Sequence, residues 1–314
     1  MTVAFDHVVL GAAGGTGSAV VRELAAGGLR VRAVTRAGTA DVPEGVEQVA
    51  ADVGTPEGAR RACEGAAVVY HCAQPPYTKW PEWFPPLTQA VLDGAAAAGA
   101  KLVFADNLYV YGPPDGPMTE ETPRRAQGTK GRTRIEMADA VLGAHVDGKL
   151  RATIGRSSDY YGPRGTGSTA GENVMKPALG GKRPRWLGSL DQPQTLNYLE
   201  DLARALVTLG ERDEADGQVW HLPSAEPLTG RRFLALVFEA AGHPPKIGVA
   251  SRPMIRTAGL FNPFLRELNE TLYQFERPFL ADASKFQRAF GPFEPTPHPE
   301  AVGRTVDWFR RRYA

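Results

Sequence analysis

Three glycines near the start of the chain have the spacing of a phosphate-binding turn. Gly11, Gly14 and Gly17 stand in the segment VVLGAAGGTGSAV, after the apolar run Val8–Leu10 and before a segment with helical apolar spacing. Glycine allows a positive φ and a close approach of the main chain, and a helix N-terminus offers N–H groups and a positive dipole. This strand, turn and helix therefore predict a site for the diphosphate of a dinucleotide. The predicted contacts of that diphosphate are Gly11, Gly14, Gly15, Thr16 and Gly17.

The end of the second predicted strand bears on which dinucleotide binds. Many dinucleotide folds place an acidic residue here for the adenosine ribose, whereas this strand ends in Thr35 and is followed by Arg36. A guanidinium can form paired hydrogen bonds with a 2′-phosphate, so this pair predicts a preference for NADP(H) over NAD(H). The alternative is that Arg36 is a solvated loop cation. Arg32 lies on the same strand face and is a weaker candidate for that phosphate.

Other predicted strand ends supply further coenzyme contacts. Asp52 follows the third strand, where its carboxylate can accept a hydrogen bond from the adenine amino group. The alternative is that Asp52 caps the helix that opens at Thr55. His71 ends the fourth strand, which places it near the coenzyme even if its ring stays in the core. By position, Val53, His71 and Ala73 complete the predicted coenzyme contacts.

The apolar pattern alternates strands with helices through the first half of the chain. Strands are expected at Val8–Leu10, Val31–Thr35, Val46–Ala50, Val68–His71, Leu102–Ala105 and Thr153–Ile154. Helices are expected at 16–26, 56–64, 85–98 and 132–146, and the small residues 94–98 favour close helix packing. This alternation predicts an α/β fold of Rossmann type, with a doubly wound parallel sheet.

The regular alternation of predicted strands and helices ends after residue 155. Gly- and Pro-rich loops at 162–167 and 177–184 begin a smaller, irregular lobe. A helix near Leu199–Leu209 and a strand near Gln218–Leu222 indicate a return to the main sheet. We therefore expect a dinucleotide-binding domain at 1–155, rejoined by 196–222, and an interleaved substrate-binding lobe formed by 156–195 and 223–314.

Composition excludes several classes of partner. The 314 residues carry 36 Lys and Arg against 35 Asp and Glu, so there is no net field to attract nucleic acid or an anionic membrane. The N-terminal segment does not have the pattern of a cleaved signal, and no apolar run approaches the roughly 20 residues of a membrane span. Cys63 and Cys72 lack metal-ligand spacing and are read as reduced, buried thiols. We expect a cytoplasmic protein with no metal site.

Several motifs together resemble the extended short-chain dehydrogenase/reductase family, which includes the NAD-dependent epimerases and dehydratases. The resemblance covers about two-thirds of the chain, and it implies a Rossmann fold, a nicotinamide coenzyme and a homodimer formed through helices 85–98 and 132–146. The residues that carry it are GAAGGTG, Ala51–Val53, Val69–Ala73, Leu102–Phe104, Tyr109–Gly112, Thr153–Arg156, Tyr161–Pro163 and Asn197–Ala203.

The reaction centre departs from the family pattern. Family enzymes carry Ser or Thr four residues before the Tyr of the Tyr-Gly pair, and this position is Asn107. They also carry Tyr-x-x-x-Lys, with Glu four residues after the Lys. Aligning on Glu136 places Arg132 at the lysine and Gly128 at the tyrosine. The resemblance is therefore to an atypical member of the family.

Other residues must then supply the proton that accompanies hydride transfer to a carbonyl. The candidate active-site residues are Asn107, Asp106, Tyr160 and Arg132. An amide can orient a carbonyl, a carboxyl or phenol can exchange a proton, and a guanidinium can bind a ribose or a substrate carboxylate but cannot act as the acid. The structural alternatives are that Asp106 caps the next turn and that Asn107 satisfies loop backbone.

Substrate contacts are expected at the carboxyl edge of the sheet and at the start of the smaller lobe. The candidates are Tyr77, Trp80, Trp83, Tyr109, Ser158 and Asp159. The aromatic residues can wall a planar or apolar substrate, and the alternative is that they pack a proline-rich loop onto the protein.

These observations favour an NADP(H)-binding oxidoreductase that acts on a small carbonyl, alcohol or sugar-like metabolite. Two alternatives stay open: a nucleotide-bound enzyme for a non-redox step such as isomerisation, elimination or cyclisation, and a non-enzymatic sensor of NAD(P).

Overall fold

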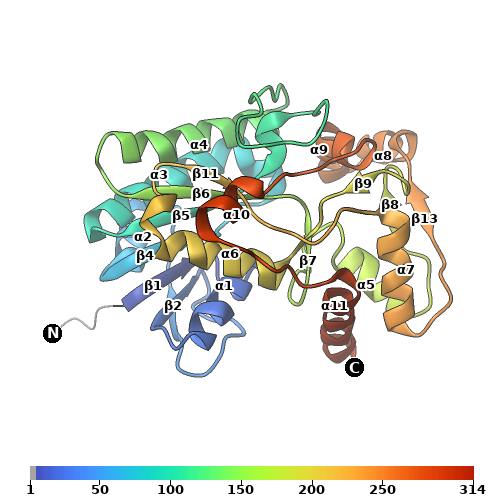
Figure 1. The fold of residues 1–314 in the computed structure, drawn as a ribbon, viewed down its shortest axis with the longest axis horizontal. Coiled ribbons are helices and arrows are strands. Elements are labelled where there is room, and N and C mark those ends of the chain that lie inside the picture. The colour runs from blue at the N-terminus through green and yellow to red at the C-terminus, as the bar shows by residue number, and fades with distance from the viewer. Residues whose placement is uncertain (1–4) are drawn as a thin grey trace. The chain divides into compact units, whose positions relative to one another are not determined.

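The computed structural model describes residues 5–314, which form two compact units. The first unit contains the residues up to 107, together with 132–156 and 202–222. The second unit contains 108–131, 157–201 and 223–314 (Figure 1). The predicted boundaries differ mainly at 108–131, which we had expected in the first domain. This segment groups with the second unit because Met118 donates a hydrogen bond to Leu280 and Lys130 pairs with Glu267.

A seven-stranded parallel sheet forms the centre of the first unit, in the order β11-β6-β5-β4-β1-β2-β3 (Figure 1). The chain first builds outward from β1 to β3 and then crosses back to add β4 beside β1. Ligands bind at the carboxyl end of a sheet where the strand order reverses in this way. The strands are β1 Phe5–Leu10, β2 Val31–Thr35, β3 Glu47–Ala50, β4 Ala66–His71, β5 Lys101–Asn107, β6 Ala152–Ser157 and β11 Val219–His221.

The structure confirms the Rossmann-type α/β fold and each predicted strand of this sheet. Val8, Val9 and Leu10 are fully buried, as expected for a parallel strand with helices on both faces. β11 pairs in parallel with β6, so the predicted return of the chain to the main sheet is correct. The helices that lie wholly or mostly in this unit are α1 Gly15–Ala26, α2 Pro56–Cys63, α3 Trp80–Ala98, α4 Thr129–Val146 and α6 Leu199–Glu211.

Helix α3 begins five residues earlier than predicted and includes Pro85 and Pro86. Each proline removes an N–H donor, which normally ends or kinks a helix. Here Trp80 and Phe84 are buried, and their packing sustains the turn before the prolines. At the other end, Gly94 lies so close to α2 that an added Cβ would stand 2.8 Å from the carbonyl oxygen of Ala59. The expectation of close packing by the small residues is thus confirmed.

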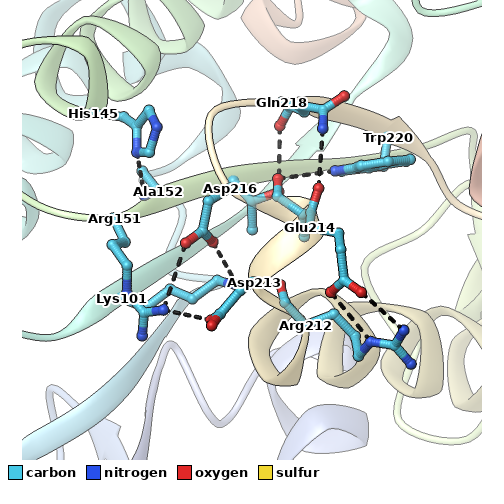
Figure 2. A network of polar contacts seen from close by, with 12 residues as sticks. Lys101, His145, Arg151, Ala152, Arg212, Asp213, Glu214, Asp216, Gln218 and Trp220 are labelled. Carbon is cyan, nitrogen blue, oxygen red and sulfur yellow. Dashed lines mark hydrogen bonds and ion pairs between the residues drawn. The ribbon is translucent and has the colours of Figure 1, made fainter. Parts of the chain in front are cut away.

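The loop before β11 is fixed to the sheet by a network of polar contacts (Figure 2). The ammonium group of Lys101, at the start of β5, lies 2.6 Å from Oδ1 of Asp216 and donates to the carbonyl of Arg212 at 2.7 Å. Nε1 of Trp220 donates to the carbonyl of Ala215 at 3.1 Å. Since the Lys101 side chain is fully buried, its charge requires these partners. The network anchors the returning strand at the amino end of β5.

The second unit packs helices around a separate apolar core. Tyr161, Trp186 and Phe233 are among its most buried side chains, and the Tyr161 hydroxyl lies 2.7 Å from Nδ1 of His298. Three two-stranded sheets, β10-β7, β12-β9 and β13-β8, join segments of this unit that are distant in the sequence. Its helices are α5 Glu172–Leu179, α7 Gly230–Ala241, α8 Arg252–Gly259, α9 Pro263–Thr271, α10 Ser284–Phe290 and α11 His298–Tyr313. Its strands are β7 Tyr160–Tyr161, β8 Arg185–Leu187, β9 Pro193–Gln194, β10 Asn197–Tyr198, β12 Leu228–Thr229 and β13 Gly248–Ala250.

Candidate functional site

The loops after β1 and β4 meet at the reversal point of the sheet. The Cys72 N–H donates to the carbonyl of Leu10 at 3.0 Å. Gly11 has φ +81°, and a Cβ added to it would stand 2.6 Å from the Cα of Ala73. A side chain at residue 11 would therefore both strain the backbone and collide with the second loop. The two loops form a narrow main-chain surface on which a ligand can lie.

The glycine turn leads into α1 with its amide groups available. Gly14 is the N-cap and has no side chain to bond the first helical N–H groups. A Cβ on Gly17 would overlap the carbonyl oxygen of Gly11, so the helix and turn approach each other only because residue 17 is glycine. The N–H groups near Gly15 and Thr16 and the positive end of the helix dipole suit a diphosphate. This geometry fits the predicted role of these residues.

The residues after β2 lie at the same edge of the sheet. The Thr35 hydroxyl donates to the carbonyl of Thr39 at 3.3 Å, which organises the loop. Arg36 is exposed, and within residues 5–314 its guanidinium has no hydrogen-bond or ion-pair partner. It is therefore accessible to a phosphate. Arg32 is different: it pairs with Glu47 at 2.6 Å and bonds the carbonyl of Glu64 at 2.8 Å, so it is occupied at the amino end of β2.

Asp52 and Val53 follow β3. The Asp52 side chain is exposed, and its Oδ1 accepts the Gly54 N–H at 3.0 Å. The alternative that Asp52 caps α2 is wrong, because Thr55 is the N-cap and accepts the Gly58 N–H at 3.1 Å. Val53 is buried. An adenine contact by Asp52 stays a prediction.

His71 is fully buried between aromatic rings rather than open to the sheet edge. Its ring centroid lies 5.1 Å from that of Phe104, and Nε2 lies 3.5 Å from the Thr88 hydroxyl. Burial, and then the charge of Arg134, lower the pKa of His71 to about 3. The imidazole is therefore neutral at physiological pH, and a coenzyme contact by His71 stays a prediction.

The aromatic residues after β4 divide into two environments. Trp80 is buried, and the centre of its ring lies 4.3 Å from the guanidinium carbon of Arg134. Its ring also meets that of Phe84 edge to face, with the ring centroids 5.3 Å apart. These contacts favour the packing alternative for Trp80. The Tyr77 ring lies 5.1 Å from that of Trp80 and is half-buried, whereas Trp83 is 47% exposed. Substrate contact by Tyr77 and Trp83 stays a prediction.

Asp106 is enclosed by two arginines of the same unit. Its Oδ2 lies 2.9 Å from Nε of Arg156, and its Oδ1 lies 3.3 Å from a terminal nitrogen of Arg134. All three side chains are almost completely buried. A guanidinium group thus lies close to each of the two carboxylate oxygens. This arrangement suits a structural ion cluster better than a proton carrier, although it is not the turn cap proposed as the alternative.

The other candidate active-site residues lie at strand and helix ends. Asn107 is the last residue of β5 and is half-buried, and Arg132 is exposed in the first turn of α4. In the second unit, Ser158 is buried and its N–H donates to Asn197 Oδ1 at 2.9 Å. Tyr160 is half-buried on β7. Their chemical roles stay predictions.

Asp159 lies next to Ser158 in an enclosed environment. Burial raises the pKa of Asp159 to about 6, although hydrogen bonds from the Tyr160 N–H and from Thr169 act in the opposite direction. A carboxyl group with this pKa changes charge close to neutral pH, as general acids and bases often do. Asp159, proposed as a substrate contact, thus also has the electrostatics of a functional residue.

A cavity of about 360 Å³ opens in the second unit. Its wall includes Tyr109, Gly128, Glu270 and Tyr273. Glu270 and Tyr273 were missed by sequence reasoning, because about 140 residues separate them from Gly128 and no motif connects the two segments. Gly128 could have been the signal: a Cβ there would lie 2.5 Å from the Glu270 carboxyl carbon, so a side chain at residue 128 and Glu270 compete for one volume.

Across 5–314 there is no group of three or more His, Cys, Asp or Glu side chains placed to hold a metal ion. The same part of the chain contains no helix with the length and apolarity required to cross a membrane.

Comparison with known proteins identifies relatives over most of the chain. It is 24% identical over 226 residues to a dTDP-glucose 4,6-dehydratase of Streptomyces griseus, covering 71% of this chain and 63% of that protein. It is 23% identical over 306 residues to an Arabidopsis thaliana 3beta-hydroxysteroid-dehydrogenase/decarboxylase isoform, covering 84% and 52%. The chain thus spans less than two-thirds of the length of either relative.

Solved structures share the fold at low identity. UDP-glucuronic acid 4-epimerase from Bacillus cereus, in complex with NAD, superposes with a TM-score of 0.79 at 17% identity, covering 98% of this chain and 100% of the other. The dTDP-glucose 4,6-dehydratase DesIV from Streptomyces venezuelae, with NAD bound, gives 0.78 at 20%, covering 98% and 97%. A family model for the NAD dependent epimerase/dehydratase family matches residues 7–222. That match includes the glycine turn, all strands of the sheet except the first two residues of β1, and the departures at 107, 128 and 132, and the chain belongs to this family.

Proposed function

We propose that this protein is an NADP(H)-binding oxidoreductase that acts on a hydroxyl or carbonyl group of a small, sugar-like metabolite. The observation that carries the proposal is the close main-chain approach of Gly11 to Gly17 and to Ala73, which leaves no room for a Cβ at residue 11 or 17. That cradle fits a dinucleotide diphosphate, bound by amide groups and the dipole of α1. A nicotinamide held there supplies or accepts hydride.

The substrate class is inferred from relatives. The dehydratase relatives act on dTDP-glucose, and the Bacillus cereus structure is that of a UDP-glucuronic acid epimerase. The plant relative is named as a steroid dehydrogenase/decarboxylase, so the family context includes non-sugar alcohols. We therefore propose a secondary alcohol or its ketone, with nucleotide sugars as the first compounds to test.

The choice of NADP(H) rests on the end of β2. Thr35 stands where an acidic residue would repel a 2′-phosphate, and the accessible Arg36 follows it. The solved relatives were obtained with NAD, so the preference must be measured. A charge-assisted hydrogen bond is worth about 1.5–3 kcal/mol, which corresponds to roughly 10- to 100-fold in affinity.

The deciding experiment for the coenzyme is calorimetric titration with NADPH and NADH. We expect Arg36→Ala to lose NADPH affinity by about 10- to 100-fold and to keep its NADH affinity. Arg60→Ala, which removes an exposed arginine from α2 in the same unit, is the matched control and should change neither. Equal affinity of the wild type for the two coenzymes defeats the preference, and binding of neither defeats the proposal.

Turnover is tested with deuteride-labelled NADPH or NADH and a panel of UDP-glucose, UDP-glucuronic acid, dTDP-glucose and small keto sugars. Deuterium in the product supports net reduction. Conversion without label and without any transient absorbance of reduced coenzyme supports the second candidate function, a non-redox reaction, which the absence of the family tyrosine and lysine at Gly128 and Arg132 favours. Tight coenzyme binding without any conversion supports a sensor.

A further inference from the structure

Exposed apolar side chains concentrate in one short segment of the second unit. Among residues 5–314, five of the eight large apolar side chains that are exposed lie between β13 and the first turn of α9: Val249, Met254, Leu260, Phe261 and Phe264. Leu260 is 75% exposed and Phe261 is 88% exposed, and both lie in the turn between α8 and α9 (Figure 1). A concentration of this kind is typical of a surface that contacts another molecule.

Helix α8 is apolar on its outer side as well as on its inner side. Its buried residues, Ile255 and Gly259, are one turn apart and face the core. The solvent-facing positions include Met254 and Ala258, together with the exposed charge of Arg256. The outer face of a surface helix is normally polar, so packing inside this unit does not explain the composition of α8.

The turn after α8 has a defined geometry. The side chain of Asn262 caps α9 by accepting its first two free N–H groups, at 3.0 and 3.3 Å. α8 and α9 approach closely at Gly259, where an added Cβ would stand 3.0 Å from the Cα of Arg266. These contacts fix the two helices against each other. The fold therefore holds Leu260 and Phe261 out in solvent.

The charges in and beside this region are of one sign. Segment 240–266 contains no Asp or Glu, and neither does 177–190, which supplies β8, the strand that pairs with β13. The cations of the two segments are Lys182, Arg183, Arg185, Lys246, Arg252, Arg256 and Arg266. The near balance of charge over the whole chain conceals this concentration, so the argument from net charge against a membrane partner does not hold for this surface.

Two of these arginines have no counter-charge. The carboxylates that follow the turn are half-buried and have partners: Glu267 and Glu270 contact Lys130, and Glu276 pairs with Arg252. Arg256 and Arg266 are exposed, and within residues 5–314 neither guanidinium has a hydrogen-bond or ion-pair partner. Arg256 and Leu260 line the same groove on α8. Free cations thus lie beside exposed apolar side chains.

We propose that the α8–α9 turn is a docking surface for an anionic phospholipid bilayer. Leu260 and Phe261 enter the boundary between headgroups and acyl chains, and Arg256 and Arg266 contact the anionic headgroups. The chain thereby lies on a membrane without crossing it. This inference is independent of the proposed function.

The chemistry of the surface favours a bilayer over other partners. A two-fold interface pairs a surface with itself, so a second copy would bring these unpaired cations against each other. A nucleic acid would neutralise the arginines and leave Leu260 and Phe261 in water. A bilayer provides both an anionic layer and an apolar layer, in the order in which side chains projecting from a turn would meet them.

Flotation of the full chain with vesicles of phosphatidylcholine, with and without phosphatidylserine, tests the proposal. We expect binding to the vesicles that contain phosphatidylserine, and weaker binding as salt screens the charges. Phe261→Ser should weaken this binding by about 10- to 100-fold, and Arg256→Gln by about fivefold. Because both side chains are exposed, the melting temperature should not change.

Two variants at exposed positions on other helices are the matched controls. Val146→Ser removes an apolar side chain of α4 that is 82% exposed, and Arg311→Gln removes an exposed cation of α11. Both should bind vesicles like the wild type. If either control weakens binding as much as its counterpart in the turn, the effect is not specific to the α8–α9 turn and the proposal is wrong.

A fluorescent label reports which part of the chain enters the bilayer. Phe261→Cys labelled with nitrobenzoxadiazole should gain intensity and shift to the blue when phosphatidylserine vesicles are added. The same label on Arg311→Cys should keep its emission in water, and wild type treated with the reagent gives the background from Cys63 and Cys72. Flotation without a change at residue 261 means that another surface binds, which overturns the proposal.

The remaining outcomes also decide. Failure to float with either kind of vesicle overturns the proposal, as does equal binding with and without phosphatidylserine. Sedimentation that shows a dimer, dissociated by Phe261→Ser, in a protein that does not float assigns the surface to a second copy. Binding of a single-stranded RNA oligonucleotide, weakened by Arg256→Gln, without flotation assigns it to nucleic acid. Either result replaces the lipid assignment.

Discussion

Nε of Arg156 lies 2.9 Å from Oδ2 of Asp106, so two neighbouring strands of the sheet, β6 and β5, are connected by a buried ion pair at their carboxyl ends. Arg134 of α4 adds a second cation on the other oxygen, and its guanidinium stacks on Trp80 and Phe84. One carboxylate thus links two strands and, through Arg134, two helices at the carboxyl end of the sheet.

Asp106→Asn should destabilise the protein by about 3–5 kcal/mol, because it removes the buried negative charge that two buried guanidinium groups contact. Urea unfolding at pH 7.5 measures the change. Asp191→Asn removes an exposed carboxylate that pairs with Arg231 and should leave the midpoint almost unchanged. If Asp106→Asn unfolds like the wild type but loses turnover, Asp106 acts in the reaction after all.

Gly17→Ala should weaken coenzyme binding by at least tenfold and lower stability by about 1–3 kcal/mol, because the new Cβ must push α1 away from the Gly11 carbonyl. Gly143→Ala provides the contrast. Residue 143 lies in α4 with no atom within 4 Å of an added Cβ, so alanine should raise stability by about 0.5–1 kcal/mol. Calorimetry and thermal unfolding measure both effects. If Gly17→Ala keeps the coenzyme affinity of the wild type, the glycine turn from Gly11 to Gly17 is not the site of the diphosphate.

Asp159 should make the stability of the protein depend on pH. Its pKa is about 6 in the folded protein against 3.8 for the unperturbed group, so the folded state binds the proton more tightly. This contribution is complete below pH 4 and is lost as the pH rises through 6. Asp159→Asn should therefore gain stability over the wild type between pH 4 and pH 7.5, by about 3 kcal/mol at most. If the difference in free energy of unfolding between Asp159→Asn and the wild type, measured in urea, is the same at both pH values, the carboxyl of Asp159 is not buried.

Both cysteine thiols should react slowly with thiol reagents in the folded protein. Burial raises the pKa of Cys63 and of Cys72 to about 12, so the reactive thiolate is scarce at pH 8. Ellman's reagent should titrate two thiols per chain in urea and react with them only slowly under native conditions. Rapid labelling of Cys72, the more exposed of the two, would show that the loop after β4 opens.

The sheet was predictable because each strand carries its own apolar signature and the glycine turn marks where the first one ends. Val8–Leu10 and Val31–Thr35 are read correctly from local pattern alone. Helix α3 was shortened in the prediction because Pro85 and Pro86 resemble a helix start. The burial of Trp80 beneath Arg134 depends on a residue 54 positions away, which no local pattern records.

The candidate site shows the same division. The main-chain cradle is local, because Gly11, Gly14 and Gly17 belong to one turn, and it was found. The environment of a side chain is not local: His71 was expected at the coenzyme, and Thr88 and Phe104 enclose its ring. Arg32 was a candidate for binding a phosphate, and its guanidinium instead forms an ion pair with Glu47. Glu270 had no motif that could have drawn attention to it.

The late arrival of β11 has a consequence for how the protein is made. The strand that completes the sheet is encoded at 219–221, after the excursion of 157–201 into the second unit. During synthesis, the backbone N–H and C=O groups on the β11 side of β6 therefore stay unpaired until more than sixty further residues have left the ribosome. An unpaired edge of this kind recruits other strands, so a nascent or truncated chain that lacks residue 219 onward is the form of this protein most prone to aggregate.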